Sequence, residues 1–198
     1  MGNSAVDEGI LQIMIWNEIL CLGDSITYGA RDEYGRSPTA ELAKILTEQT
    51  KEVYICHNHG ISGETSSDLL RRTWDATKSR KDSNIALVMI GTNDTQRAIP
   101  ADVYQDNLRQ IINMCKIHGM HVIIATLPSL GFTPLYYKNS HLIDTYNNII
   151  RNLAHELNVG VCDMSGVERH YVDGVHFTNA GHREIANRWA TKILTSQT

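Results

Sequence analysis

Apolar residues gather in five short runs along the chain, and polar segments with helical periodicity lie between them. The runs span residues 19–22, 53–56, 85–90, 122–125 and 159–162. Runs of this length that are apolar at nearly every position are typical of strands buried on both faces of a parallel sheet. Elsewhere apolar residues recur three or four positions apart, as in Leu108, Ile111 and Cys115, and this spacing predicts amphipathic helices.

Capping residues mark where several of these helices begin and end. Ser37 and Pro38 open the first long helix, because serine is a common N-cap and proline fits the first helical position. A second helix begins near Thr65 and is expected to turn Trp74 inward. Gly119 ends a third helix, which begins near residue 101. Two further helices are predicted after about residue 140 and at the end of the chain.

Strands and helices therefore alternate about five times. Right-handed crossovers between parallel strands place their helices on both faces of the sheet. The pattern predicts one domain over residues 1–198, with a three-layer α/β/α architecture around a five-stranded parallel sheet. Residues 1–15 are a weakly specified lead-in to it. A chain of 198 residues is long enough to bury a core of this kind.

Composition narrows the possible partners and the compartment. The formal net charge is −4 and no basic cluster is present, which argues against a nucleic-acid partner. No apolar run approaches the length that spans a bilayer. The first nine residues lack the basic and apolar regions of an export signal. The four cysteines lie at apolar positions and are predicted to be free, buried thiols. A cytoplasmic location is therefore expected, and the oligomeric state is not predicted.

Residues with the chemistry of acyl transfer follow the predicted strands. Ser25 follows the first strand, Gly63 the second and Asn93 the third, while Asp173 and His176 precede the last helix. In a parallel sheet these strand ends meet at one edge, where ligands bind. Acyl transfer needs a nucleophile, a base, a group that orients the base, and donors for an oxyanion. The G-x-S-x-G motif of α/β-hydrolases is absent, since Thr27 stands where its second glycine would be.

Four blocks of the sequence resemble those of the SGNH (GDSL-type) hydrolase family of esterases and lipases. They are Gly23-Asp24-Ser25-Ile26, Gly60-Ile61-Ser62-Gly63-Glu64-Thr65, Gly91-Thr92-Asn93-Asp94 and Asp173-Gly174-Val175-His176. The blocks stand in the family's order and are spread over nearly the whole chain. The chain departs from the family pattern at Ile26, which replaces a leucine, and at Phe177, where many members carry proline.

The resemblance implies a flavodoxin-like fold and a role for each of the matched residues. Ser25 would be the nucleophile, His176 the base and Asp173 the group that orients it. The N–H groups of Ser25 and Gly63 and the side chain of Asn93 would form the oxyanion hole. No cofactor is implied, and the expected partner is a small-molecule ester.

Several features allow a second interpretation. Asp24 is expected to hold the turn before Ser25 by accepting hydrogen bonds from backbone amides. A metal site is a minor alternative, because no pair of histidines or cysteines has ligand spacing. Its candidate ligands would be His57, His59, His170, His182 and Asp163. His182 is otherwise expected on a helix surface. The aromatic segment Phe132–Tyr137 either covers the core or walls an acyl or leaving-group pocket.

The function also has alternatives. A non-catalytic ligand-binding or scaffold domain could use the same fold. Within enzymes, a thioesterase or a lysophospholipase would use the same machinery as an esterase for small acyl or acetyl esters.

Overall fold

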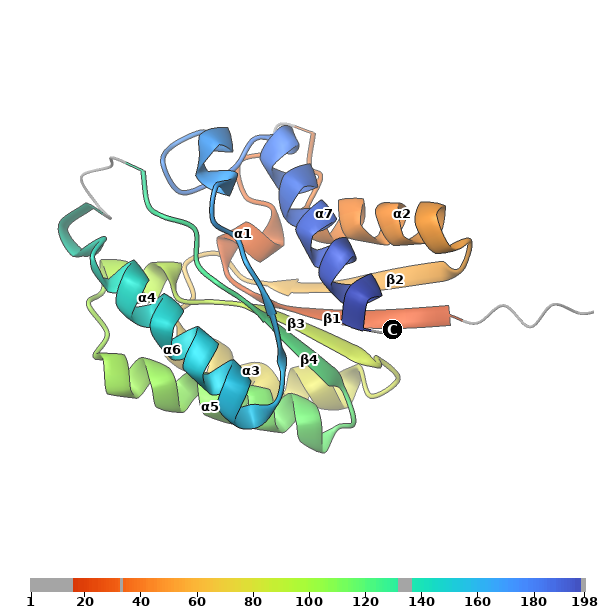
Figure 1. The fold of residues 1–198 in the computed structure, drawn as a ribbon, viewed down its shortest axis with the longest axis horizontal. Coiled ribbons are helices and arrows are strands. Elements are labelled where there is room, and N and C mark those ends of the chain that lie inside the picture. The colour runs from red at the N-terminus through yellow and green to blue at the C-terminus, as the bar shows by residue number, and fades with distance from the viewer. Residues whose placement is uncertain (1–15, 33, 132–136, 197–198) are drawn as a thin grey trace, which may run out of the picture.

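Five parallel strands form the central sheet, in the order β2-β1-β3-β4-β5 (Figure 1). A computed structural model describes residues 16–32, 34–131 and 137–196. The strands are β1 (Trp16–Gly23), β2 (Val53–Gly60), β3 (Ile85–Met89), β4 (His121–Ala125) and β5 (Gly160–Cys162). This strand order is the flavodoxin-like one, in which the order reverses between β1 and β3.

Helices cover both faces of this sheet. Helices α2 (Pro38–Thr50) and α7 (Asn179–Ser196) lie on one face, while α3 (Ser66–Ser79), α5 (Ala101–Ile117) and α6 (Leu142–Leu157) lie on the other (Figure 1). The remaining elements are short: α1 (Ser25–Tyr28), α4 (Thr92–Gln96), η1 (Tyr137–Asn139) and η2 (Val167–His170). The predicted three-layer α/β/α fold is confirmed.

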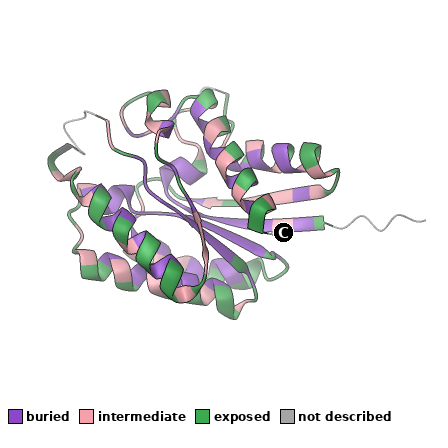
Figure 2. Ribbon diagram, viewed as in Figure 1, coloured by how far each residue is buried: buried purple, intermediate pink, exposed green. Residues whose placement is uncertain are grey.

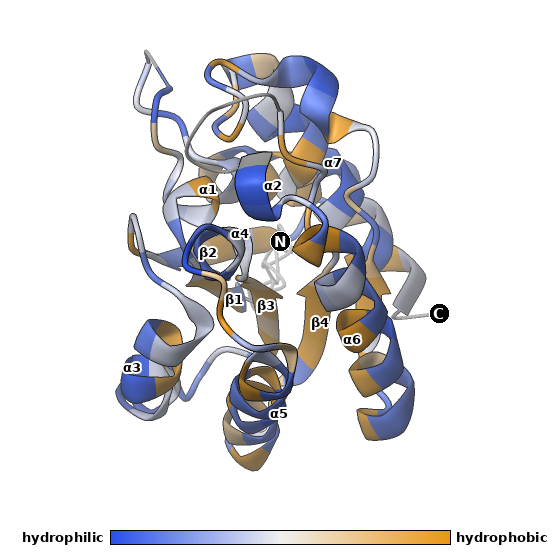
Figure 3. Ribbon diagram, turned by 90° about the vertical axis from the view of Figure 1, so that its left-hand side faces the viewer, coloured by the Kyte–Doolittle hydropathy of each residue, from blue (hydrophilic) through white to orange (hydrophobic). Residues whose placement is uncertain are grey.

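Strand β1 shows why the strand sequences are apolar at nearly every position. Ile19 and Cys21 point into the core beneath α2 and α7. Leu20 and Leu22, which alternate with them, point into the core on the opposite face. Successive side chains of a strand face opposite sides, so a strand between two helical layers must be apolar throughout. The central strands are buried and apolar, and the helices keep their polar residues outside (Figures 2 and 3).

Strand β2 extends four residues beyond the apolar run that predicted it. Residues 57–60 continue the parallel ladder with β1, where Leu20 pairs with His57 and Gly23 with Gly60. As the edge strand, β2 has paired backbone on one side only. Its side chains near this end are partly exposed, and polar residues are therefore tolerated there. The prediction from the apolar run consequently ended this strand too early.

Two side chains differ in burial from what the sequence predicts. Trp74 is 46% exposed rather than inward, and its ring meets His118 edge-on with the centroids 4.9 Å apart. The buried face of α3 is formed by Leu69, Thr73 and Ala76, which leaves Trp74 at its border. His182 was expected on a surface but is completely buried, and its Nδ1 lies 2.9 Å from the carbonyl oxygen of Arg36.

The sequence predicts free, buried thiols, and the cysteine side chains match this except for the burial of Cys56. All four are free thiols. Three of them are buried, and Cys56 is partly buried. Over residues 16–32, 34–131 and 137–196, no helix is both long and apolar enough to cross a membrane.

A steric constraint at Gly60 gives a first prediction. A Cβ atom on Gly60 would collide with the backbone nitrogen of Tyr28 and the carbonyl oxygen of Asp24. Neither can move without shifting the turn that follows β1. Gly60→Ala should therefore lower the free energy of unfolding by about 1–3 kcal/mol, measured by urea denaturation.

Gly160→Ala in β5 is the matched control. Its new methyl group would meet side-chain atoms of Ile123 and Lys192 at 3.2 Å, and these can adjust. Equal losses of stability in the two variants would show that the backbone contact at Gly60 is not limiting.

Candidate active site

Ser25 is placed by a tight turn at the carboxyl end of β1. Gly23 ends the strand, and Asp24 caps the short helix α1 by accepting a hydrogen bond from the N–H of Ile26 at 2.9 Å. This is the role expected for Asp24. Ser25 is the first residue of α1, so its own N–H has no partner within the helix. The turn leaves Ser25 at the edge between β1 and β3, where the strand order reverses.

His176 and Asp173 lie in a loop that is closed by backbone pairing. Tyr171 and Phe177 form an antiparallel bridge, and the N–H of Val172 donates to the carbonyl of His176 at 2.7 Å. Phe177, the departure from the family pattern, is fully buried, and its ring centroid lies 4.7 Å from that of Tyr171. It therefore anchors the loop to the core.

The structure brings the side chains of Ser25, His176 and Asp173 into one hydrogen-bonded row. His176 Nε2 lies 2.9 Å from Ser25 Oγ, and His176 Nδ1 lies 2.8 Å from Asp173 Oδ2. A carboxylate can only accept, so Nδ1 carries the proton and Nε2 is left to accept from the serine hydroxyl. The His176 side chain is 15% exposed, which limits competition from water.

Asp173 stays ionised despite being partly buried. Burial alone would raise its pKa, but hydrogen bonds from the backbone and the ring of His176 and from the backbone of Val175 lower it below the ordinary value. Asp173 Oδ1 accepts both backbone N–H groups, at 2.8 and 3.1 Å. The Arg31 guanidinium lies 3.7 Å from Asp173 Oδ2 and contributes further positive charge.

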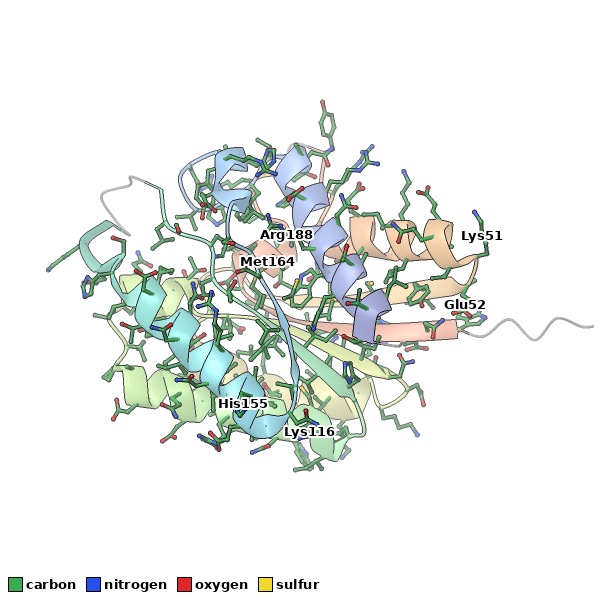
Figure 4. All side chains as sticks on the ribbon, viewed as in Figure 1. Lys51, Glu52, Lys116, His155, Met164 and Arg188 are labelled. Carbon is green, nitrogen blue, oxygen red and sulfur yellow. The ribbon has the colours of Figure 1, made fainter. Side chains whose placement is uncertain are left out.

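The segment after β5, which leads to this loop, is fixed by Arg188 on α7. Its Nη1 donates to the carbonyls of Asp163 and Ser165, at 2.9 and 2.7 Å. Arg188 and Met164 lie close together where α7 approaches the chain leaving β5 (Figure 4). Asp163, a metal candidate in the sequence, instead accepts from the hydroxyl groups of Thr126 and Ser165.

Gly63 and Asn93 line the same cleft as Ser25 and His176. The cleft has a volume of about 340 Å³, and the described residues lining it are Ser25, Ala30, Arg31, Ser62, Gly63, Asn93 and His176. Gly63 has a φ of +82°, which a residue with a side chain adopts only with strain. The five sequence-predicted site residues are thus brought to one edge of the sheet.

Asn93 is held by a polar network that the sequence did not reveal. Its Nδ2 donates to the carbonyl of Glu64 at 2.9 Å. The next residue, Asp94, is completely buried and accepts from both the N–H and the hydroxyl of Ser66. Asn107 on α5 donates to the same hydroxyl at 3.0 Å. These bonds join α4 to α3 and α5 behind the cleft.

Histidines proposed as metal ligands have other neighbours. His57 Nε2 lies 2.8 Å from a carboxylate oxygen of Glu18. Within the described part of the chain, no group of three or more His, Cys, Asp or Glu side chains is arranged to hold a metal ion. The question raised for residues 132–137 falls outside the description, because residues 132–136 and the side chain of Tyr137 are not described.

Comparison with known proteins identifies the class. Residues 21–184 match the GDSL-like Lipase/Acylhydrolase family, and the chain belongs to that family. An arylesterase of Vibrio mimicus is 27% identical over 125 residues, covering 61% of this chain and 62% of the relative. A multidomain esterase of Ruminococcus flavefaciens is 25% identical over 89% of this chain. The chain spans 62% and 28% of the lengths of these two curated relatives.

Solved structures share the fold. A carbohydrate acetylesterase family member from Sinorhizobium meliloti superposes with a TM-score of 0.78 at 20% identity, covering 90% of this chain and 98% of the other. A mutant acetylxylan esterase from Geobacillus stearothermophilus gives a TM-score of 0.77 at 22% identity, covering 91% and 96%. At these identities the likeness establishes the fold.

The carboxyl group of Asp24, directly beside Ser25, is unfavourable to ionise. It is completely buried, and its Oδ2 has no hydrogen-bond partner among the described residues. Burial raises its pKa to about 7, and the nearby carboxylates of Asp94 and Glu64 add to the effect, while the N–H of Ile26 opposes it. The folded protein therefore holds a proton on Asp24 more tightly than the unfolded chain does.

This imbalance predicts a pH-dependent effect of Asp24→Asn. Below about pH 4 Asp24 is protonated in both states, and its contribution to folding is fully present. As the pH rises from about 4 to about 7, the unfolded chain loses this proton first, so the wild type loses up to about 4 kcal/mol that the variant does not lose. Urea denaturation at several pH values should show Asp24→Asn gaining stability relative to wild type over that window.

Asp75→Asn, on the exposed face of α3, is the matched control for removing a carboxylate. A stability difference between Asp24→Asn and wild type that stays constant from pH 4 to 8 would contradict the raised pKa.

Proposed function

We propose that this chain is a serine esterase that hydrolyses small carboxylic esters, with a short acyl group such as acetyl, through an acyl-enzyme intermediate. The observation that carries the proposal is the row of contacts from Ser25 Oγ to His176 Nε2, at 2.9 Å, and from His176 Nδ1 to Asp173 Oδ2, at 2.8 Å. The row opens into the cleft that Gly63 and Asn93 also line.

In the first step Ser25 is the nucleophile. Its Oγ attacks the ester carbonyl carbon as His176 Nε2 takes the hydroxyl proton. The carbonyl π electrons move to oxygen and give a tetrahedral oxyanion. When this collapses, the bond to the alcohol oxygen breaks, and that oxygen receives the proton from His176. In the second step water attacks the acyl-enzyme by the same route and releases the acid.

Asp173 keeps the base in the tautomer that this route requires. It accepts a hydrogen bond from Nδ1–H of His176, which keeps the proton on Nδ1, so Nε2 faces Ser25 without one. The lowered pKa of Asp173 keeps it charged at neutral pH, which stabilises the imidazolium formed during attack. It remains ionised through both steps.

Three donors would meet the oxyanion: the N–H of Ser25, the N–H of Gly63 and the side-chain amide of Asn93. They come from the ends of β1, β2 and β3, which are neighbours in the sheet. Fixed donors of this kind stabilise charge that appears only in the transition state.

The lining of the cleft favours a substrate with a short acyl group over one with a long acyl chain. Its described lining consists of polar or small residues, and a long acyl chain would need an apolar surface to replace water. This lining favours the proposed esterase over a lysophospholipase. A thioesterase would use the same residues and is distinguished by its turnover of thioesters.

Related proteins support an esterase. The relatives in Vibrio mimicus and Ruminococcus flavefaciens bear the names arylesterase and multidomain esterase. A cytoplasmic location is part of the proposal, and the four free cysteines support it.

Ester turnover with modification of Ser25 tests the proposal. The purified protein should hydrolyse p-nitrophenyl acetate, with kcat/KM falling for butyrate and octanoate. A fluorophosphonate should label Ser25, as located by mass spectrometry. Ser25→Ala should lower kcat by several orders of magnitude with the fold intact, because it removes the oxygen that forms the acyl-enzyme.

Ser62→Ala is the control, since Ser62 supplies the second hydroxyl among the described residues that line the cleft. It should keep both labelling and turnover. Label on a different serine would refute the role of Ser25. A protein that neither labels nor turns over esters and thioesters would favour the non-catalytic binding domain.

Replacing Asn93 tests the oxyanion donors separately. Asn93→Ala should lower kcat about 10²–10³-fold, or about 3–4 kcal/mol, and change KM little, because the donor acts mainly on transition-state charge. Slow labelling of Ser25 should persist. Asn152→Ala, on the exposed face of α6, should leave kcat unchanged. A lowered melting temperature with normal kcat would identify Asn93 as a turn residue only.

A further inference from the structure

Arg72 on α3 reaches the end of the sheet. It joins segments whose relative positions matter for the proposed mechanism. Its Nε lies 2.9 and 2.8 Å from the two carboxylate oxygens of Glu64. Its Nη2 donates to the same carboxylate and to the carbonyl oxygens of His59 and Gly23, at 2.8 and 3.3 Å. A planar guanidinium can serve several acceptors at once, which an ammonium group does less well.

Each acceptor of Arg72 belongs to a segment that carries a proposed functional group. Gly23 is the last residue of β1, two residues before Ser25. Its carbonyl also accepts from the N–H of Ile61, at 3.1 Å. His59 lies near the end of β2, from which the loop to Gly63 leaves. Arg72 thus ties the start of this loop to the strand that delivers Ser25.

Glu64 extends this connection to Asn93. While its carboxylate binds Arg72, its backbone carbonyl accepts from Asn93 Nδ2 at 2.9 Å. Glu64 directly follows Gly63, so the same residue fixes one side of the Gly63 peptide and one donor of the Asn93 amide. The ends of β1, β2 and β3 are therefore linked through one ion pair.

Residues 61–63 have little packing of their own to hold them. All three are exposed, and a Cβ atom on Gly63 would meet nothing within 4 Å. In contrast, the Arg72 and Glu64 side chains are only 22% and 14% exposed. A second guanidinium, that of Arg97, donates to the carbonyl of Gly63 at 3.1 Å. The loop is thus held by polar contacts at both ends.

We propose that Glu64 and Arg72 are positioning residues, which hold the Gly63 N–H and the Asn93 amide where a substrate oxyanion forms. The inference rests on the proposed esterase function. Neither side chain lines the described cleft, so both act through the loop. Displacement of a donor by a fraction of an ångström weakens transition-state stabilisation more than substrate binding, because the full charge develops only in the transition state.

Arg72→Met tests the proposal, since it removes the guanidinium and keeps most of the apolar stem. Its kcat for p-nitrophenyl acetate should fall about 10–100-fold, with KM changed less than about threefold. Rates are to be divided by the concentration of folded protein, determined by circular dichroism at the assay temperature. Arg72→Lys, which keeps the charge without the planar fork, should recover part of the lost kcat.

A double-mutant cycle separates positioning from general stability. If Arg72 acts through the oxyanion donors, Arg72→Met should cost less in kcat when Asn93 is already alanine than in the wild type. A role in stability alone would give equal fold-changes in both backgrounds, and that result would overturn the proposal. Should Arg72→Met fail to fold, Glu64→Gln gives the same comparison, because it keeps the shape of the side chain and removes its charge.

Arg109→Met is the matched control. Arg109 on α5 also pairs with a glutamate through both carboxylate oxygens, those of Glu156 on α6, away from the cleft. Its kcat should stay within about twofold of wild type. Ester turnover by the wild type with unchanged kcat in Arg72→Met would refute the positioning role and leave the esterase proposal standing. Absence of turnover by the wild type would refute both.

Discussion

Close approach of backbone segments at the end of β1 is the constraint on which the site depends. Gly23 and Gly60 stand opposite each other in the parallel ladder. A Cβ atom on Gly23 would collide with the carbonyl oxygen of Met89, and one on Gly60 with the backbone of Tyr28. Three strands and the α1 turn meet with no space for a side chain. Ser25 consequently has one position available to it, at the edge where the strand order reverses.

The fold could be predicted because strands that are buried on both faces of the sheet are apolar at nearly every position. The apolar runs located all five strands, and Ser37 with Pro38 located the start of α2. The predictions that were wrong concern the end of a strand or the buried face of a helix, where the outcome depends on a particular neighbouring group. The end of β2 is polar because it lies at the sheet edge. Trp74 lies beside the buried face of α3, and His182 is buried against a backbone carbonyl.

The residues of the site also fall into two groups, those that the sequence predicts and those that it does not. Ser25, Gly63 and Asn93 could be expected at one edge because each follows a strand of a parallel sheet, and Asp173 and His176 were expected from their motif. The supporting residues carry no comparable signal. Arg72 shares a helical face with Leu69 and Ala76, so a charge at a position that the apolar spacing buries was a clue. Its partners could not be deduced, because two of them are backbone carbonyls and the third lies before the helix.

Electrostatics behind the cleft explains why this support is polar rather than apolar. The N–H groups of Ile26 at the start of α1 and of Ser66 at the start of α3 need acceptors, and the buried carboxyls of Asp24 and Asp94 supply them. Burying these carboxyls is costly, and it raises the pKa of both. Glu64 adds to that repulsion at Asp24, and its ion pair with Arg72 places a compensating positive charge beside it. The ion pair therefore does two things at once: it orders an exposed loop, and it limits the negative charge close to the point where an oxyanion would form.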